Sequence, residues 1–223
     1  MKVAIVGAGR MGSLLAARLP GSFRKVIIAR RRARAVQLAD EVGGVASDQL
    51  SAVRGCHVVL LAIPGPEIPN VLSDLAPHLD RDAIVVNMAT DVPTEELAES
   101  FPDLRIVAAK VIGHAREMAH GSPGIVVLDR VNPEEEELLA SILGGLGPVI
   151  RDSEEKVRLA NTAVAEEMVK AELSLRRRLE ELGLEPELIR VAIKTTAPGV
   201  MRSLSDGDAG PFVQDVIRRL RGA

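Results

Sequence analysis

The chain has 223 residues, of which 47% are hydrophobic and 26% are charged, and its formal net charge is −3. This composition predicts a globular protein of one large or two small domains, and it excludes a strongly basic or acidic chain. Cys56 is the only cysteine, which excludes an internal disulfide, and no apolar run reaches the roughly 18–20 residues that span a bilayer.

The sequence also lacks the patterns of a zinc site and of a signal peptide. No spacing of cysteine and histidine resembles a zinc site, so we expect no metal. The first apolar run is cut short by glycines, so it predicts a strand and not a signal peptide. We therefore expect a cytoplasmic protein that binds no membrane.

The first predicted strand runs directly into a glycine-rich turn. Val3–Val6 is apolar, and a helical pattern over residues 10–19 follows the turn. The turn has the spacing G-x-G-x-x-G and consists of Gly7, Ala8, Gly9, Arg10, Met11 and Gly12. Gly7 permits the tight turn, Gly9 leaves room for a pyrophosphate, and Gly12 lets the helix lie close to the strand. The helix start also offers free N–H groups to phosphate, so we predict a dinucleotide site, although a turn without a ligand can contain similar glycines.

The second predicted strand, residues 25–29, ends in a cluster of arginines over residues 30–34. An NAD site usually carries an acid about 20 residues beyond the glycines, but the nearest acid here, Asp40, lies a full helix away. Guanidinium groups bind a 2′-phosphate well, so we predict NADP(H), held by Arg30 and Arg31. A solvated basic helix start is the alternative. Nucleic acid is not expected, because the cluster is isolated and aromatic residues are almost absent.

Strands and helices alternate over the rest of the first part of the chain. In chain order, we expect a helix at 31–42, a strand at 45–46, a helix at 47–54, a strand at 57–63, a helix at 67–77, a strand at 83–88, a helix at 93–100, strands at 105–112 and 125–128, a helix at 133–143 and a strand at 149–150. Such alternation is typical of a doubly wound, mostly parallel α/β sheet of the Rossmann type. We predict this dinucleotide-binding domain over residues 1–152.

The last part of the chain is expected to be entirely helical. An apolar stripe at helical spacing predicts one long helix over 153–182, followed by helices at 186–196 and 211–220 with a turn at Pro198-Gly199. A segment of this size is small for an independent domain. We therefore predict a helical substrate and dimerisation domain over 153–223, which packs on the sheet domain, on a second subunit, or on both.

The carboxyl ends of parallel strands gather at one edge of a sheet, where ligands bind. Ala62, Ile63 and Pro64 end one such strand, and we expect them to line the cofactor site near the nicotinamide ribose, although Pro64 also simply stops a strand. Asn87 ends the next strand. It is a candidate for bonding to the ribose or carboxamide, or it is an asparagine that shapes a turn.

Three further polar residues are candidates for catalysis. Lys110 interrupts an apolar strand near its end, as a cation facing substrate or as a lysine that reaches out to solvent. His114 follows Gly113 and is a candidate proton donor to a carbonyl or imine, or a histidine of a surface loop. Asn161 lies among small residues of the long helix, where it faces either a ligand or a neighbouring helix.

Residues Val3 to Pro64, with the GAGRMG turn, the arginine-ended strand and the LLAIP strand, resemble the cofactor half of the pyrroline-5-carboxylate reductase family. That family reduces a cyclic imine with NAD(P)H and dimerises through a helical C-terminal domain. The resemblance implies the same cofactor chemistry and a homodimer formed by residues 153–223. Asn87, Val111-Ile112-Gly113 and Asn161 are similar to segments of the ketopantoate reductase family, which reduces a 2-keto acid with NADPH.

These observations together predict an NADP(H)-dependent oxidoreductase that reduces a C=N or C=O bond of a small, anionic substrate. The alternatives are a 2-keto acid reductase, a reductase linked to coenzyme F420, and a protein that binds or senses NADPH without catalysis.

Overall fold

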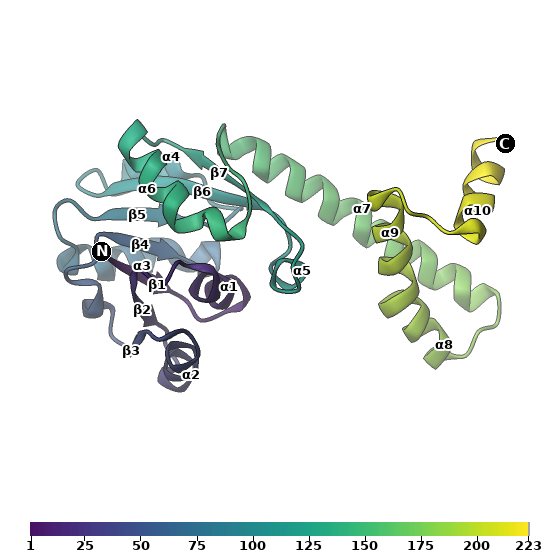
Figure 1. Cartoon of the computed structure of the whole chain (residues 1–223), viewed down its shortest axis with the longest axis horizontal. Helices are drawn as coiled ribbons and strands as arrows, with labels where there is room; N and C mark the ends of the chain where they lie inside the picture. Colours follow the sequence, from purple (N-terminus) through teal and green to yellow (C-terminus); the bar gives the residue numbers. More distant parts are fainter. Residues whose placement is uncertain (223) are drawn as a thin grey trace. The chain divides into compact units, whose positions relative to one another are not determined.

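The computed structural model describes residues 1–222, and the chain forms two compact units, Met1–Thr162 and Ala163–Ala223. The long helix α7 (Glu154–Glu181) begins in unit 1 and continues into unit 2 (Figure 1). Its first turns belong to unit 1 because Val157 is fully buried there and the Asn161 side chain donates a hydrogen bond to the carbonyl of Val111. The units therefore divide after Thr162, ten residues beyond the boundary expected from the sequence.

Unit 1 is built on one sheet of eight strands in the order β3-β2-β1-β4-β5-β6-β7-β8. All neighbouring strands are parallel except β6 and β7. This confirms the predicted mostly parallel, doubly wound sheet. The strand order runs outward in one direction from β1 to β3 and in the other from β4 to β8, so it reverses between β1 and β4. The strands are β1 (Lys2–Val6), β2 (Arg24–Ile28), β3 (Val45–Ser47), β4 (Val58–Leu61), β5 (Ile84–Asn87), β6 (Arg105–Ile112), β7 (Ile125–Asp129) and β8 (Val149–Arg151).

Helices cover both faces of this sheet, and each face has its own apolar core (Figure 1). One core contains side chains of α1 (Arg10–Arg18), α2 (Arg32–Val42), α5 (Ala115–Ala119) and α6 (Pro133–Leu143). The other contains side chains of α3 (Ile68–Leu75) and α4 (Thr94–Ser100). The central strands are buried on both sides, which explains their unbroken apolar sequence.

A capping box closes the start of α6, and an ion pair joins this helix start to the beginning of β6. The Asn132 side chain accepts a hydrogen bond from the Glu135 amide, and the Glu135 carboxylate accepts one from the Asn132 amide. Arg105 Nε donates to Glu135 Oε1 over 2.6 Å. Burial by itself would raise the pKa of Glu135, but the hydrogen bonds from Arg105 and Asn132 outweigh it and hold the pKa below its usual value.

Three local predictions need correction. The helix expected at 47–54 is a single 3-10 turn over Leu50–Val53. The helix expected at 67–77 is α3 with a 3-10 turn on either side, at Gly65–Glu67 and Ala76–His78. Each of these three segments has a proline at its first or second position, where the missing N–H is tolerated. The turn expected at Pro198-Gly199 lies instead within helix α9 (Ala197–Asp206), which continues without a break from a π-helical turn over Ala192–Thr196.

Unit 2 contains the rest of α7, then α8 (Pro186–Val191), a π-helical turn (Ala192–Thr196), α9 and α10 (Pro211–Arg221). Of residues 163–222, only Ile189 is buried. Large apolar side chains are exposed on every helix of the unit, up to 79% for Phe212 and 75% for Leu220. The apolar stripe of the long helix is thus present, but from Val164 onward no part of this unit buries it.

Within residues 1–222, no helix combines the length and the apolar character needed to cross a membrane.

Candidate functional site

The turn between β1 and α1 depends on close backbone contacts at two glycines. Gly7 has a φ of +112°, and its amide donates to the carbonyl of Ile28 over 2.8 Å. A Cβ on Gly7 would lie 2.9 Å from the carbonyl carbon of Ala62, and one on Gly12 would lie 2.8 Å from the carbonyl carbon of Gly7. Gly7 therefore lets β1 approach the end of β4, and Gly12 lets α1 approach β1.

The glycine between them has a different environment. No heavy atom lies within 4 Å of a Cβ placed on Gly9, and its φ of −81° suits any residue. Gly9 is the N-cap of α1, and no side chain caps this helix. The first N–H groups of α1 are therefore open to an anion, as a pyrophosphate requires.

A cavity of about 750 Å³ opens at this turn, where the strand order changes direction. Its lining includes Gly7, Ala8 and Gly9 from the first turn and Ala62, Ile63 and Pro64 from the end of β4. Arg30, Arg31 and Arg34 line it from the end of β2 and the start of α2. Most of the residues predicted to bind the cofactor are thus brought together at the carboxyl edge of the sheet.

The four arginines that follow β2 have different partners. Arg30 forms an exposed ion pair with Glu67 over 3.1 Å, and Arg32 forms one with Asp48 over 3.5 Å. The Arg34 guanidinium donates to the amide oxygen of Gln37, and the Arg31 guanidinium makes no hydrogen bond or ion pair among residues 1–222. Arg31 and Arg34 are therefore the guanidinium groups in this cluster without a carboxylate. An exposed ion pair contributes only about 0–1 kcal/mol, so Arg30 can also turn to a phosphate.

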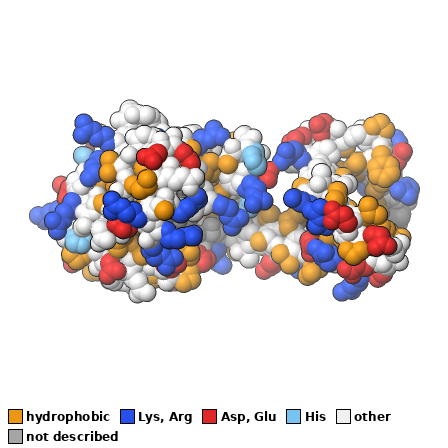
Figure 2. All heavy atoms as spheres, turned by 90° about the horizontal axis from the view of Figure 1, so that it is seen from below, with side chains coloured by type: hydrophobic (Ala, Val, Ile, Leu, Met, Phe, Trp, Pro, Cys, Tyr) orange, Lys and Arg blue, Asp and Glu red, His pale blue; other side chains and the backbone are white. Residues whose placement is uncertain are grey.

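A second, basic groove of about 910 Å³ adjoins the cavity between α1, α2 and α5. It shares Ala8, Gly9, Arg31 and Arg34 with the cavity, and Arg10, Arg18 and Arg116 line it further along. Figure 2, a view from below Figure 1, shows many Lys and Arg side chains on the surface of unit 1. The positive charge raises the local concentration of anionic ligands at the mouth of the cavity.

Three residues of the predicted turn do not line the cavity, and one of them, Arg10, lines the adjoining basic groove. Gly12 is buried against Gly7, and Met11 packs partly against the apolar core beside α1. They support the turn from behind.

Asn87 does not face the cavity, because its side chain is fully buried and holds the loop that follows β5. Its Oδ1 accepts from the Ala89 amide, and its Nδ2 donates to the Val92 carbonyl and to Thr94 Oγ1. In this structure Asn87 shapes the turn, as the alternative reading of the sequence allowed. A contact with the cofactor stays a prediction.

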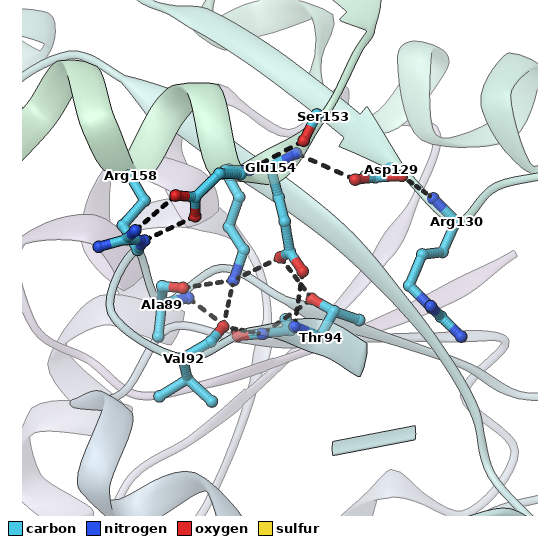
Figure 3. Close-up of polar contacts among 11 residues, drawn as sticks. Ala89, Val92, Thr94, Asp129, Arg130, Ser153, Glu154 and Arg158 are labelled. Carbon is cyan, nitrogen blue, oxygen red and sulfur yellow. Dashed lines mark hydrogen bonds and ion pairs between the residues drawn. The ribbon is translucent and has the colours of Figure 1, made fainter. Parts of the chain in front are cut away.

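Lys110 is 1% exposed and lies in a polar network with Asn87, Thr94 and Glu154 (Figure 3). Its ammonium donates to the carbonyls of Ala89 and Val92 and lies 3.2 Å from Glu154 Oε2. Burial lowers the pKa of Lys110, and the neighbouring carboxylate of Glu154 opposes that shift. All three of its donors have protein partners, so the geometry favours a structural tie, and direct contact with substrate stays a prediction.

His114 and Asn161 lie elsewhere. His114 is exposed at the N-cap of α5, on the loop after β6. The Asn161 side chain donates to Val111 O over 2.9 Å and joins α7 to β6. Neither lines the cavity, and the structure does not bring Lys110, His114 and Asn161 together at one site. Their catalytic roles stay predictions.

Sequence reasoning missed Arg34 and Glu154. Arg34 lies three residues after Arg31 on the same helix, so helical spacing places both on one face and predicts their convergence. No such signal marks Glu154, which lies in an acidic first helical turn like that of α6. Only the fold shows that its carboxylate meets a buried lysine.

Residues 2–91 match the family described as "NADP oxidoreductase coenzyme F420-dependent". The chain is 26% identical over 166 residues to a glycerol-3-phosphate dehydrogenase [NAD(P)+] of Rhizobium etli, covering 65% of this chain and 51% of that protein. It is 32% identical over 166 residues to a glutamyl-tRNA reductase of Methanothermobacter marburgensis, covering 64% of this chain and 42% of the other. It therefore spans about half of the length of these relatives or less.

Among solved structures, the chain is similar to a pyrroline-5-carboxylate reductase from Coxiella burnetii, with a TM-score of 0.69 and 19% identity. The likeness covers 99% of this chain and 90% of the other. At this identity it shows a shared fold. The match of residues 2–91 to the description of an NADP oxidoreductase family agrees with the resemblance expected from the glycine turn.

The open space at Gly9 leads to a prediction. Gly9→Ala keeps an allowed backbone and meets no protein atom, so the protein is expected to fold with a small loss of stability at most. The added methyl group occupies the path of the pyrophosphate, so the Kd for NADPH is expected to rise about tenfold or more, a loss of about 1.4 kcal/mol of binding free energy. Calorimetric titration with NADPH and thermal unfolding measure both effects.

Gly21→Ala is the matched control, because that position is also open but does not line the cavity. Unchanged NADPH binding by Gly9→Ala would show that the diphosphate does not pass over this turn.

Proposed function

We propose that this protein is an NADP(H)-dependent oxidoreductase that reduces a C=N or C=O bond of a small, anionic substrate. The observation that carries the proposal is the cavity between the ends of β1, β2 and β4, with an uncapped helix start, an open glycine and two arginines that lack a carboxylate partner. The sequence match of residues 2–91 to NADP oxidoreductases supports it.

The residues of the cavity fit the groups of this cofactor. The N–H groups at the start of α1 would bind the diphosphate, and Arg31 and Arg34 would bind the 2′-phosphate through charge-assisted hydrogen bonds. Ala62–Pro64 would form the apolar wall toward the nicotinamide ribose. When NADPH is bound, its dihydronicotinamide supplies the hydride.

The chain must also supply a proton to the nitrogen or oxygen of the substrate. Of the candidates, His114 is exposed on the loop at the carboxyl end of β6, next to Ala115 and Arg116 of the basic groove, and its side chain is open to a ligand. Lys110 would first have to leave Glu154 and two carbonyls. We therefore assign the proton donor to His114 in preference to Lys110.

A second candidate function is NADPH binding or sensing without catalysis. It is favoured by the internal hydrogen bonds of Asn87, Lys110 and Asn161, which occupy the polar side chains expected to act on a substrate.

Turnover decides between these functions. The proposed enzyme is expected to oxidise NADPH with at least one member of a panel of cyclic imines, 2-keto acids and oxidised coenzyme F420, or to reduce NADP⁺ with glycerol 3-phosphate, followed at 340 nm. Tight NADPH binding without turnover on the whole panel would favour sensing. No binding of either pyridine nucleotide would overturn both functions.

Cofactor selectivity is expected to depend on Arg31 and Arg34. Arg31→Ala and Arg34→Ala should each raise the Kd for NADPH about tenfold, since a hydrogen bond to a charged group contributes about 1.5–3 kcal/mol. The Kd for NADH should change little, because NADH has no 2′-phosphate. Arg24→Ala, which changes an exposed arginine outside the cavity, is the control. Equal losses for NADPH and NADH would contradict this assignment.

We also propose that the protein is a homodimer formed by unit 2. Eleven large apolar side chains of residues 163–222 are exposed while only Ile189 is buried, and burial of one such side chain contributes about 1.5–3 kcal/mol. A unit of about 60 residues without a core is not expected to fold alone, so a second copy that covers these faces supplies what is missing.

Sedimentation analysis at micromolar concentration tests the dimer. Wild-type protein should sediment at twice the chain mass of 23.8 kDa, and Val164→Glu on the apolar stripe should shift it toward the monomer. Ser174→Glu adds the same charge at an exposed polar position of the same helix and should leave the dimer intact. A monomeric wild-type protein would contradict the proposal.

A further inference from the structure

The polar network around Lys110 joins four segments of unit 1. Thr94 begins α4, and both its amide and its hydroxyl donate to the Glu154 carboxylate over 2.7 Å. Lys110, from β6, lies 3.2 Å from the same carboxylate, and Asn87, from the end of β5, donates to the Thr94 hydroxyl over 3.0 Å. Glu154 belongs to the first turn of α7, so the network fixes the start of that helix to the sheet (Figure 3).

The same network holds the loop between β5 and α4. Lys110 donates to the carbonyls of Ala89 and Val92, and Asn87 bonds to the Ala89 amide and the Val92 carbonyl. Every hydrogen-bonding atom of a buried side chain has a partner among residues 1–222. A buried network without unsatisfied groups is rigid, because any movement of one member leaves another unpaired.

This loop in turn packs on the wall of the nucleotide cavity. A Cβ on Gly65 would lie 2.6 Å from Val92 Cγ2 and would overlap the Asp91 carboxylate. Gly65 follows Pro64, which lines the cavity, and it begins the 3-10 turn that carries Glu67, the partner of Arg30. A continuous set of contacts thus runs from Glu154 through Lys110 and residues 89–92 to the cavity wall.

We infer that Lys110 and Glu154 are positioning residues of the nucleotide site, which hold residues 89–92 against the Pro64–Gly65 turn and couple that turn to the start of α7. The inference rests on the proposed function only in taking NADPH as the ligand. Since coupling between two sites is reciprocal, NADPH that orders the Pro64–Gly65 turn must also stabilise the first turn of α7.

We expect the protein to fold without this ion pair if both charges are removed together. Removal of one partner leaves an uncompensated buried charge, but removal of both charges is often tolerated. The double variant Lys110→Met/Glu154→Gln is therefore expected to fold, with the Gln amide still able to accept from Thr94. What it loses is the ammonium that binds the carbonyls of Ala89 and Val92.

Hydrogen exchange read by mass spectrometry tests the inference in the full chain. Without ligand, the double variant should exchange faster than wild type at residues 64–67, 88–94 and 154–158. With NADPH, wild type should gain protection at 64–67 and also at 154–158, whereas the variant should lose the protection at 154–158. The variant should bind NADPH about tenfold more weakly, a typical size for coupling between sites.

Arg105→Met/Glu135→Gln is the matched control, because it removes an ion pair of the same unit that also joins β6 to a helix start but does not line the cavity. It should lower stability without changing the Kd for NADPH or the exchange at 64–67. Wild-type exchange at 64–67 in the Lys110 variant, or equal effects in both double variants, would overturn the inference.

Failure of the proposed function gives a different result. If wild type binds no NADPH, the function falls, but exchange without ligand still decides whether Lys110 and Glu154 hold the Pro64–Gly65 turn.

Discussion

The cavity between the ends of β1, β2 and β4 depends on the approach of Gly12 to the carbonyl group of Gly7. A side chain at Gly12 would collide with that carbonyl, so α1 would have to move away from β1 and carry its free N–H groups away from the cavity. Gly7 imposes the same constraint on the other side, because it lets β1 lie against the carbonyl of Ala62 at the end of β4. Together these contacts place an uncapped helix start at the point where the sheet changes direction.

Three arginines line this cavity, and their positive charge suits an anionic ligand. The arginines after β2 are exposed, so they cost little to the fold, and two of them are free of carboxylates. The positive charge of Lys110 on β6 has a different environment. Its side chain is buried, and all three of its N–H donors bond to groups of the protein. The first arrangement leaves positive charge available to a ligand. The second fixes backbone segments that no apolar side chain could hold through hydrogen bonds.

Unit 2 differs from unit 1 in how much of its apolar surface is buried. Unit 1 buries two cores, one on each face of its sheet, whereas unit 2 exposes large apolar side chains on all its helices. Helices obtain most of their stability in proteins from packing of an apolar face. The sequence of unit 2 is therefore suited to a surface that a second chain completes, as we propose for the dimer.

Local patterns in the chain predict the sheet, the glycine turn and a ligand site at the ends of β1, β2 and β4. These features arise from local patterns: unbroken apolar strands, glycines at a fixed spacing, and arginines directly after a strand. The tertiary structure alone decided which polar side chains are free. Asn87, Lys110 and Asn161 looked alike in the sequence as candidates for a ligand, and all three are bonded to groups 5 to 50 residues away. A hydrogen bond depends on positions in space within a few tenths of an ångström, and strand periodicity and residue spacing along the chain do not encode those positions.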